Sequence, residues 1–322
     1  MMELFLATRK GLVTAVQTGN GWQIEARGLT GREVTTVTAR EGVILAGTRD
    51  GVFRSEDGGV SWLEKSNGLT ERYVRWLAYH PDVSGLELAG MEPAAIFVSR
   101  DGGDSWRECV EVSDLRREHE WWLPYSPGAG CVRGFSFHGQ RAYAAVEVGA
   151  ALRSDDGGAH WRLVDGANGR PVFGAPPAQF VHPDVHSIEV HPSSADLVFA
   201  PTGGGFYASR DGGQTWRQIN DCLYVRAVWL DADDPQHLVL GASDGPDGEN
   251  GRIEVTHDGG QSWQQVAGRW PNNMVERFQQ IGHNLWAVMA NGNLLMTPLA
   301  QLDWQPVLVA LTDVNDLTVM GA

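Results

Sequence analysis

Several side chains that could do chemistry lie in one short segment, His182-Pro-Asp-Val-His186. Its two imidazoles and one carboxylate alternate along the chain. Because Pro183 favours an extended conformation for His182, all three side chains would face the same side of a strand. Two imidazoles and a carboxylate can bind a divalent metal, so one prediction is a metal site at His182, Asp184 and His186. The alternative is a polar strand entrance in which both histidines are hydrogen-bonded.

Three arginines occupy equivalent positions in a second pattern. Arg75, Arg133 and Arg226 each directly follow the Val of a Val-x-x-apolar motif. Guanidinium groups bind carboxylate, sulfate or phosphate through two parallel hydrogen bonds, so an anion site is predicted. Tyr73 and Tyr224 lie two residues before Arg75 and Arg226, where they would share a strand face and add hydroxyl donors. In the alternative interpretation, the arginines form ion pairs between neighbouring structural units, with Glu33, Glu71, Glu147 or Glu276.

Carboxylates and aromatic rings indicate a third kind of chemistry. Hydrolysis of a glycosidic bond usually needs two carboxyl groups roughly 5–10 Å apart. The carboxylates considered for that role are Glu118, Glu120, Glu147, Asp184 and Glu276, with the first three as catalytic candidates. The rings of Trp121, Trp122 and Tyr125 suit stacking on a sugar or an aromatic ligand. The alternative is a lid that packs these rings into a small core of its own.

A short sequence repeat predicts the structural elements that must position these residues. The pattern [S/T]-x-D-x-G-x-[S/T]-W occurs five times, and His160 replaces the second hydroxyl residue once. The copies begin at Ser55, Ser99, Ser154, Ser209 and Thr256. The Asp can accept backbone N–H groups inside a turn, and Gly supplies positive φ. The Trp can fill a seam against a neighbouring unit, so the pattern predicts a self-capping hairpin turn.

This pattern resembles the Asp-box, or BNR repeat, of sialidases, sortilin-type receptors, xyloglucan hydrolases and photosystem II assembly propellers. The resemblance implies a β-propeller. It also implies that each box joins the third and fourth strands of a blade, on the face opposite the ligand site. The boxes are therefore expected to be structural.

The Val-x-x-apolar motif sets the number of blades. Its seven copies are spaced 39–58 residues apart and begin at Val34, Val74, Val132, Val185, Val225, Val275 and Val314. Each unit contains four short strands with turn punctuation. The segment Val314–Met320 reads as a first strand, and Met2–Ala7 reads as a second strand. We therefore predict an all-β, seven-bladed propeller of four-stranded antiparallel blades, closed by pairing of these two segments.

The predicted propeller is one domain, residues 1–322, with insertions at 110–130 and 165–185. Both insertions connect a fourth strand to the next first strand, which in such propellers lies on the ligand-binding top face. The residues after the motif valines would gather near the axial mouth of that face. In chain order they are Thr35, Arg75, Arg133, His186, Arg226, Glu276 and Asn315.

Charge excludes some partners. The chain has 25 Lys and Arg against 40 Asp and Glu, a formal net charge of −15. Such a surface repels phosphate backbones and anionic membranes, so neither nucleic acid nor membrane is expected as a partner. The first residues contain no basic segment followed by a long apolar run, and a cytoplasmic location is predicted.

Three functions remain open. The favoured one is binding of an anionic or carbohydrate-like small molecule, or of a protein partner, at the top axial pocket. The second is a glycoside hydrolase, in which the three arginines would mimic the sialidase arginine triad, although the Arg-Ile-Pro motif of sialidases is absent. The third is a metal-assisted lyase or hydrolase of a small molecule. Whether the chain is an enzyme stays open.

Overall fold

The computed structural model describes residues 2–19, 21–126, 129–170, 174–222, 224–268 and 273–320. Backbone contacts group the chain into two compact units. Unit 1 comprises Met1–Met91, Phe97–Glu108 and Glu276–Ala322. Unit 2 comprises Glu92–Ile96 and Cys109–Val275.

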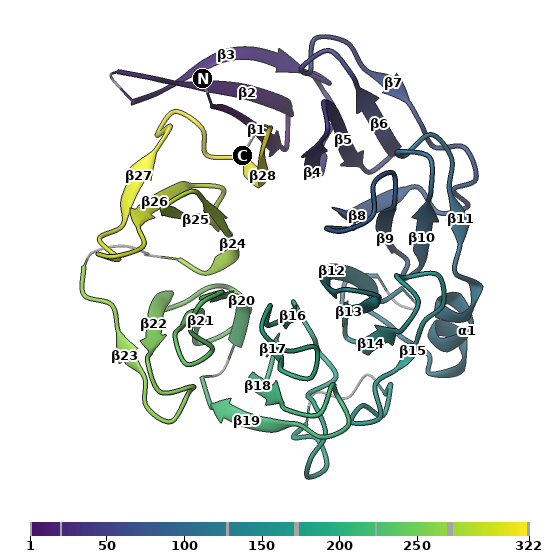
Figure 1. Cartoon of the computed structure of the whole chain (residues 1–322), viewed down its shortest axis with the longest axis vertical. Coiled ribbons are helices and arrows are strands. Elements are labelled where there is room, and N and C mark those ends of the chain that lie inside the picture. The colour runs from purple at the N-terminus through teal and green to yellow at the C-terminus, as the bar shows by residue number, and fades with distance from the viewer. Residues whose placement is uncertain are drawn as a thin grey trace. The chain divides into compact units, whose positions relative to one another are not determined.

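Seven four-stranded antiparallel sheets form the structure (Figure 1). The strands follow one another in chain order within every sheet except the first, in which β28 joins β1, β2 and β3. This arrangement confirms the predicted fold class, an all-β, seven-bladed propeller. Because the sheet with β28 combines the two ends of the chain, it also confirms the predicted closure.

Four sheets belong mainly to unit 1. Their strands are β28 (Val314–Met320), β1 (Glu3–Thr8), β2 (Gly11–Thr18) and β3 (Gly21–Gly28); β4 (Val34–Arg40), β5 (Val43–Thr48), β6 (Gly51–Ser55) and β7 (Leu63–Glu64); β8 (Tyr73–Tyr79), β9 (Glu87–Glu92), β10 (Ile96–Ser99) and β11 (Arg107–Glu108); and β24 (Val275–Ile281), β25 (Asn284–Met289), β26 (Leu294–Pro298) and β27 (Gln305–Val307).

Unit 2 contains three sheets and one helix. The elements are α1 (Val110–Glu118); β12 (Cys131–His138), β13 (Arg141–Glu147), β14 (Ala150–Ser154) and β15 (Arg162–Leu163); β16 (Glu189–Val190), β17 (Val198–Thr202), β18 (Gly205–Ser209) and β19 (Arg217–Asn220); and β20 (Tyr224–Leu230), β21 (Leu238–Ser243), β22 (Arg252–Thr256) and β23 (Gln264–Gln265).

The closing sheet is held by backbone pairing and by an apolar core. Strands β1 and β28 pair antiparallel from Glu3 opposite Met320, with Leu6 opposite Leu317. Leu6 and Leu317 are buried and pack in one cluster with Trp286 of β25. The pairing satisfies the inner edge of β1, which would otherwise expose unpaired backbone groups.

The five Asp-boxes adopt one conformation. Each joins the third and fourth strands of its sheet, as the resemblance implied. In the first box, Asp57 accepts hydrogen bonds from Ser55 Oγ (2.8 Å), Ser61 N (2.9 Å) and Ser61 Oγ (2.6 Å). Gly58 and Gly59 have φ of 72° and 86°, a region that favours glycine. In the third box, His160 Nδ1 lies 2.6 Å from Asp156 Oδ2 and replaces the hydroxyl.

Two box tryptophans bridge neighbouring sheets. The Nε1 of Trp106 donates to Lys65 O (2.9 Å), directly after β7, and that of Trp263 donates to Ile219 O (3.0 Å) on β19. Each indole therefore reaches from its own sheet to the preceding one. This confirms the prediction that the box Trp fills a seam.

The insertion at 110–130 contains a helix, α1, which the sequence analysis did not predict. Glu111 lies in its first turn and Arg116 and Arg117 in its last, an arrangement that complements the helix dipole. In the described ranges no helix has the length and apolar character needed to cross a bilayer. A single domain over residues 1–322 would require the two units to associate, and this part of the expectation stays a prediction.

The first box predicts how stability depends on pH. Hydrogen bonds from Ser61 and Ser55 lower the pKa of Asp57 from 3.8 to about 2. Because the folded pKa lies below the unfolded one, this stabilisation is present above pH 3.8 and is lost as the pH falls through about 2. The free energy of unfolding, measured in urea over this range, should fall less steeply for Asp57→Asn than for the unmodified protein. Asp247→Asn, at an exposed loop residue, is the control and should keep the original slope; an unchanged slope for Asp57→Asn would contradict the prediction.

Candidate functional site

The first strands of four sheets contain a β-bulge directly after the motif valine. Val132 and Gly134 of β12 pair with two consecutive residues of β13, so Arg133 is the extra residue. The same register shift occurs in three other first strands, where the extra residues are Thr35, Asn315 and Arg226. A bulge interrupts simple side-chain alternation and re-aims the extra residue. The Val-x-x-apolar motif in these sheets therefore marks a bulge, which the sequence analysis missed because it assumed a regular strand.

In unit 2, Arg133 forms an ion pair with Glu147, the last residue of β13. Arg133 Nη1 lies 3.0 Å from Glu147 Oε2. Both residues belong to the sheet of β12–β15, so this ion pair lies within one sheet and not between neighbouring units as the alternative interpretation expected. Glu147 is 6% exposed. Burial by itself would raise the pKa of Glu147, but the charges of Arg133, His186 and Arg226 outweigh burial and hold it well below its usual range. The cluster therefore contains an ionised, buried carboxylate.

Asp184 and His186 contact each other in the segment before β16. His186 Nδ1 lies 2.7 Å from Val225 O and must donate to it, because a carbonyl only accepts. His186 Nε2 lies 3.1 Å from Asp184 Oδ2. Asp184 Oδ1 accepts from Val148 N (3.1 Å). Burial raises the pKa of Asp184, but the charge and hydrogen bond of His186 reverse that effect and the net shift is downward.

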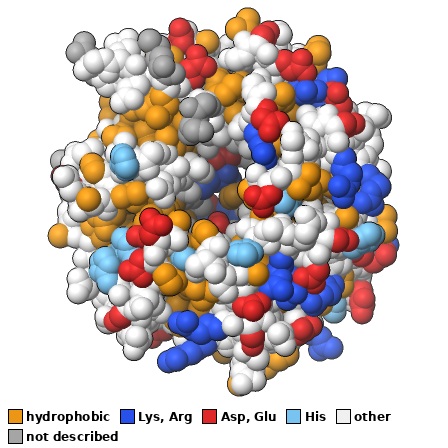
Figure 2. Space-filling model, viewed as in Figure 1, with side chains coloured by type: hydrophobic (Ala, Val, Ile, Leu, Met, Phe, Trp, Pro, Cys, Tyr) orange, Lys and Arg blue, Asp and Glu red, His pale blue; other side chains and the backbone are white. Residues whose placement is uncertain are grey.

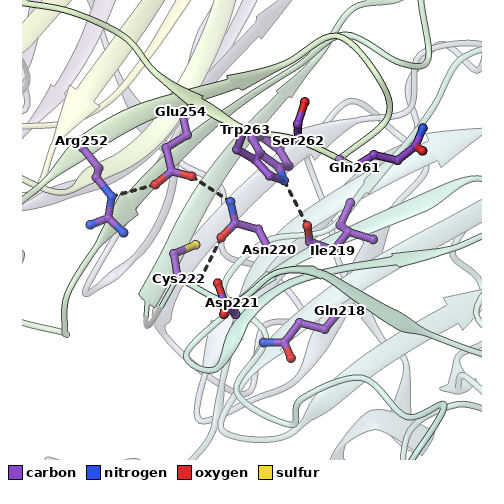
Figure 3. A pocket seen from close by; sticks show the side chains of 11 residues that line it. Gln218, Ile219, Asn220, Asp221, Cys222, Arg252, Glu254, Gln261, Ser262 and Trp263 are labelled. Carbon is purple, nitrogen blue, oxygen red and sulfur yellow. Dashed lines mark hydrogen bonds and ion pairs between the residues drawn. The ribbon is translucent and has the colours of Figure 1, made fainter.

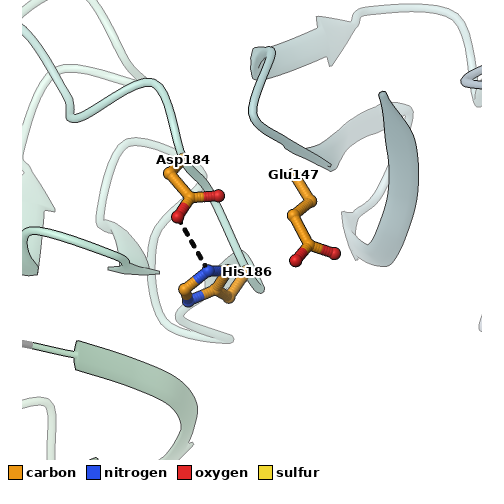
Figure 4. A group of neighbouring side chains, drawn as sticks. All are labelled: Glu147, Asp184 and His186. Atoms are coloured by element: carbon orange, nitrogen blue, oxygen red, sulfur yellow. Dashed lines mark hydrogen bonds and ion pairs between the residues drawn. The ribbon is translucent and has the colours of Figure 1, made fainter. Parts of the chain in front are cut away.

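Three buried side chains converge here: Glu147, Asp184 and His186 (Figure 4). One potential ligand atom from each lies within 4.8 Å of the other two. His182 is outside this group, and its Nδ1 accepts from Asp184 N at 3.2 Å. Burial lowers the pKa of His182. The structure thus brings together two members of the predicted metal set with Glu147 in place of His182; metal binding itself stays a prediction.

Each of the two tyrosines contacts the arginine two residues later, one pair in each unit, while their role as hydroxyl donors to a ligand stays a prediction. In unit 2, Tyr224 OH lies 3.3 Å from Arg226 Nη2, and the Tyr224 ring contacts His186 at a centroid distance of 4.5 Å. Burial raises the pKa of Tyr224. In unit 1, Tyr73 OH accepts from Arg75 Nη1 at 2.5 Å. Each tyrosine therefore orients the guanidinium two residues later.

A second charged cluster lies in unit 1. Asp316, 2% exposed, pairs with Arg277 Nη1 at 2.5 Å and accepts from Thr36 Oγ1 at 2.8 Å. The Arg277 guanidinium lies 3.5 Å from the centroid of the Trp76 ring. All four residues occupy the second variable position of the Val-x-x-apolar motif. These four residues were not among the predicted site residues, which within this motif all came from the first variable position, although the same motif contains them.

Three further predicted residues lie in unit 1. Thr35 Oγ1 donates to Val74 O (2.6 Å), and Asn315 Nδ2 donates to Val34 O (2.8 Å). Both side chains therefore link first strands of different sheets. Glu276 is half-buried on β24.

The two insertions together line a cavity of about 800 Å³ in unit 2. Its lining residues are Glu118, His119, Glu120, Trp122, Asn168 and Arg170. The predicted carboxylates Glu118 and Glu120 are exposed there, and the cavity brings them close to Trp122.

The other two aromatic residues of the first insertion differ in exposure. Trp121 is fully buried and its Nε1 donates to Gly169 O (2.7 Å). This hydrogen bond fixes one insertion against the other. Tyr125 is 63% exposed. Stacking of a ligand on these rings stays a prediction, and only Trp122 of the three lines the cavity.

A smaller cavity of about 460 Å³ was not anticipated from the sequence (Figure 3). It lies where β19 and the loop after it approach the sheet of β20–β23. Glu254 at its wall accepts from Asn220 Nδ2 (2.8 Å) and pairs with Arg252 Nε (2.7 Å). Because these polar groups satisfy one another, the hydrogen bonds hold two neighbouring sheets together.

Known proteins with similar sequences include a photosystem II assembly protein and xyloglucanases. No family model matches the chain. The photosystem II assembly lipoprotein Ycf48 of Synechococcus sp. (strain CC9902) is 26% identical over 295 residues, covering 78% of this chain and 80% of that protein. A xyloglucanase of Hypocrea jecorina is 25% identical over 177 residues. This chain is a propeller with Asp-boxes that is similar to Ycf48 and to the xyloglucanases.

The coverage differs between these relatives. This Asp-box propeller spans only 19% of the length of the Hypocrea xyloglucanase. It spans 25% of an oligoxyloglucan-reducing end-specific xyloglucanase of Emericella nidulans, at 23% identity. The relation therefore extends over most of Ycf48 but only a part of each xyloglucanase.

Solved structures share the fold. A structure of YCF48 bound to D1 peptide superposes with a TM-score of 0.62 at 15% identity, covering 92% of this chain and 88% of that one. An ancestral GH74 enzyme gives a TM-score of 0.62 at 17% identity, covering 89% of this chain and 38% of that one. At these identities the similarity concerns the fold alone. These matches lend no support to a sialidase activity.

The close approach of Gly203 to Asp184 allows a test of the site geometry. A Cβ atom on Gly203 would lie 2.1 Å from Asp184 Oδ2. Gly203→Ala should therefore displace the carboxylate and lower the free energy of unfolding by roughly 1–3 kcal/mol, as overpacking does. Urea denaturation measures the change. The matched control is Gly245→Ala, whose Cβ meets no atom within 4 Å and which should cost less than about 0.5 kcal/mol; equal stability of the two variants would contradict the placement of Asp184.

Proposed function

We propose that this propeller binds an extended segment of a partner protein and anchors a carboxylate of that segment in unit 2. The anchoring residues are Arg133, Arg226 and Tyr224. The observation that supports this is the pair of guanidinium groups at two bulge positions, Arg133 at 3.0 Å from Glu147 Oε2 and Arg226 at 3.3 Å from Tyr224 OH. A guanidinium has five N–H donors in a planar fork, so each arginine can serve an internal and an external acceptor together.

The distribution of charge supports a local anion site. The net charge of the chain is −15, yet the face in Figure 2 shows basic side chains among the acidic ones. A partner carboxylate would therefore respond to the cations nearest to it, because surface charges beyond about 8–10 Å are largely screened at physiological salt. In unit 2 those cations are Arg133 and Arg226.

The relatives support a protein partner over a polysaccharide. The chain matches four fifths of the length of Ycf48, but at most a quarter of each xyloglucanase. A structure of YCF48 carries a D1 peptide. By analogy, we infer that this propeller works as a binding protein. A cytoplasmic location is part of the proposal and has no separate support.

Peptide binding tests the proposal. The probes are fluorescein-labelled acidic peptides of one sequence, with either a free carboxylate or an amide at the C-terminus, read by fluorescence anisotropy. The carboxylate form should bind more tightly, and Arg226→Gln should weaken its binding roughly tenfold to a hundredfold, the value of a charge-assisted hydrogen bond. Arg27→Gln, on the exposed face of β3, is the control. Equal affinity of the unmodified protein and Arg226→Gln for every peptide would refute the proposed anchor.

Glycoside hydrolysis is the second candidate, favoured by the 800 Å³ cavity that holds Glu118, Glu120 and Trp122. A panel of aryl glycosides and xyloglucan oligosaccharides tests it. If Glu120 is the general acid or base, Glu120→Gln should lose at least about a hundredfold in kcat. Glu249→Gln, in an exposed loop, should keep full activity. Absence of turnover on the whole panel would remove this candidate. The third candidate, a metal-assisted reaction, depends on a metal at the cluster of Figure 4.

A further inference from the structure

We propose that Glu147, Asp184 and His186 form a binding site for one divalent metal ion, and that Zn²⁺ is the ion that fits it. This set differs from the one expected from the alternating histidines, since Glu147 comes from another sheet and His182 is excluded. The site adjoins the proposed peptide anchor, since Arg133 pairs with Glu147 and the Tyr224 ring contacts His186, but its test does not depend on peptide binding. Its three side chains are 2–6% exposed, so they are not a surface cluster of acidic groups.

The orientation of His186 is the first argument. Its Nδ1 donates to Val225 O at 2.7 Å, so the neutral imidazole carries its proton on Nδ1 and turns its Nε2 lone pair towards Asp184. Metal-binding histidines almost always donate their second ring N–H to a carbonyl or carboxylate in this way. With that tautomer, the 3.1 Å contact from Nε2 to Asp184 Oδ2 sets two lone pairs against each other. A cation between them, either a proton or a metal ion, removes the repulsion.

The two carboxylates are the second argument, because other groups orient both of them. Val148 N donates to Asp184 Oδ1 at 3.1 Å, which leaves Oδ2 facing His186. Arg133 Nη1 lies 3.0 Å from Glu147 Oε2. Outer contacts of this kind are typical of metal sites, where they fix the direction of the ligands.

The distances require a modest adjustment. Zinc bonds to nitrogen and oxygen of about 2.0–2.2 Å place tetrahedral ligand atoms roughly 3.3–3.6 Å apart. The ligand atoms of the cluster lie within 4.8 Å of one another. The widest pair must therefore close by about 1.2–1.5 Å at most. Rotation about the side-chain bonds of Glu147, which has the longest side chain of the three, can supply this.

The neighbouring charges select the ion. Arg133 Nη1 lies 3.0 Å from Glu147 Oε2, and its positive charge opposes any cation at the site. An ion bound only through electrostatic attraction to oxygen, such as Mg²⁺ or Ca²⁺, is disfavoured most. Zn²⁺ gains in addition from an imidazole ligand. Three protein ligands leave a fourth position for water or a ligand group.

The experiment uses the full chain after dialysis against EDTA and measures binding of ZnCl₂ alone, by equilibrium dialysis with elemental analysis. We expect about one zinc per chain, with His186→Gln and Asp184→Asn each weakening the affinity by about tenfold or more. A rise in Tm on adding zinc, present in the unmodified protein and lost in His186→Gln, is the second readout. Circular dichroism establishes that both variants are folded.

Two controls separate this site from other zinc binding. His182→Gln removes the neighbouring buried histidine and should retain one zinc per chain at unchanged affinity; loss of zinc there would overturn the ligand set in favour of one that includes His182. His257→Gln removes an exposed histidine and should also have no effect. The proposal is overturned if the unmodified protein binds fewer than about 0.1 zinc per chain at saturation, a result that needs no variant to fold. Equal binding by His186→Gln would overturn it too.

Discussion

In four sheets, an extra residue near the start of the first strand changes the direction in which a polar side chain of this propeller points. A regular strand would alternate its side chains between two faces, but the bulge re-aims Arg133 and Arg226 in unit 2 and Thr35 and Asn315 in unit 1. In unit 2 both re-aimed arginines approach one buried carboxylate, Glu147. The ion pair between Arg133 and Glu147 then makes burial of that carboxylate possible, because an unpaired buried charge would be costly.

The two units use the same motif for different purposes. In unit 1 the second variable position holds Thr36, Trp76, Arg277 and Asp316, which satisfy one another through hydrogen bonds, an ion pair and a cation–π contact. In unit 2 that position holds the small residues Gly134, Ser187 and Ala227, and the polar groups come from the first variable position and from segments outside the motif. A cluster that satisfies itself stabilises the fold. A cluster assembled from several segments is better suited to ligands.

The residues proposed for binding and those proposed for catalysis lie in different parts of unit 2. The arginines and the candidate metal ligands stand on strands or directly beside them, which hold side chains in fixed positions. Glu118 and Glu120 stand at the end of α1 and in the loop after it, beside an 800 Å³ cavity. Because the boxes and the paired strands keep the sheets in place, loops and strand starts are the positions at which related propellers of this kind can differ in ligand.

The sequence determined the features that depend on local interactions. Five Asp-boxes specify their own turns, since the Asp, the hydroxyl residues and the glycines lie within eight residues, and the spacing of the motif valines fixes seven blades. The pairing of Val314–Met320 with the N-terminal strand followed from the strand patterns of the two segments. The bulges, helix α1 and the choice of Glu147 over His182 beside Asp184 and His186 were decided by tertiary structure. The bulges depend on the register of paired strands, and the cluster depends on contacts between residues 36 or more positions apart, which hydrophobic patterns along one segment do not encode.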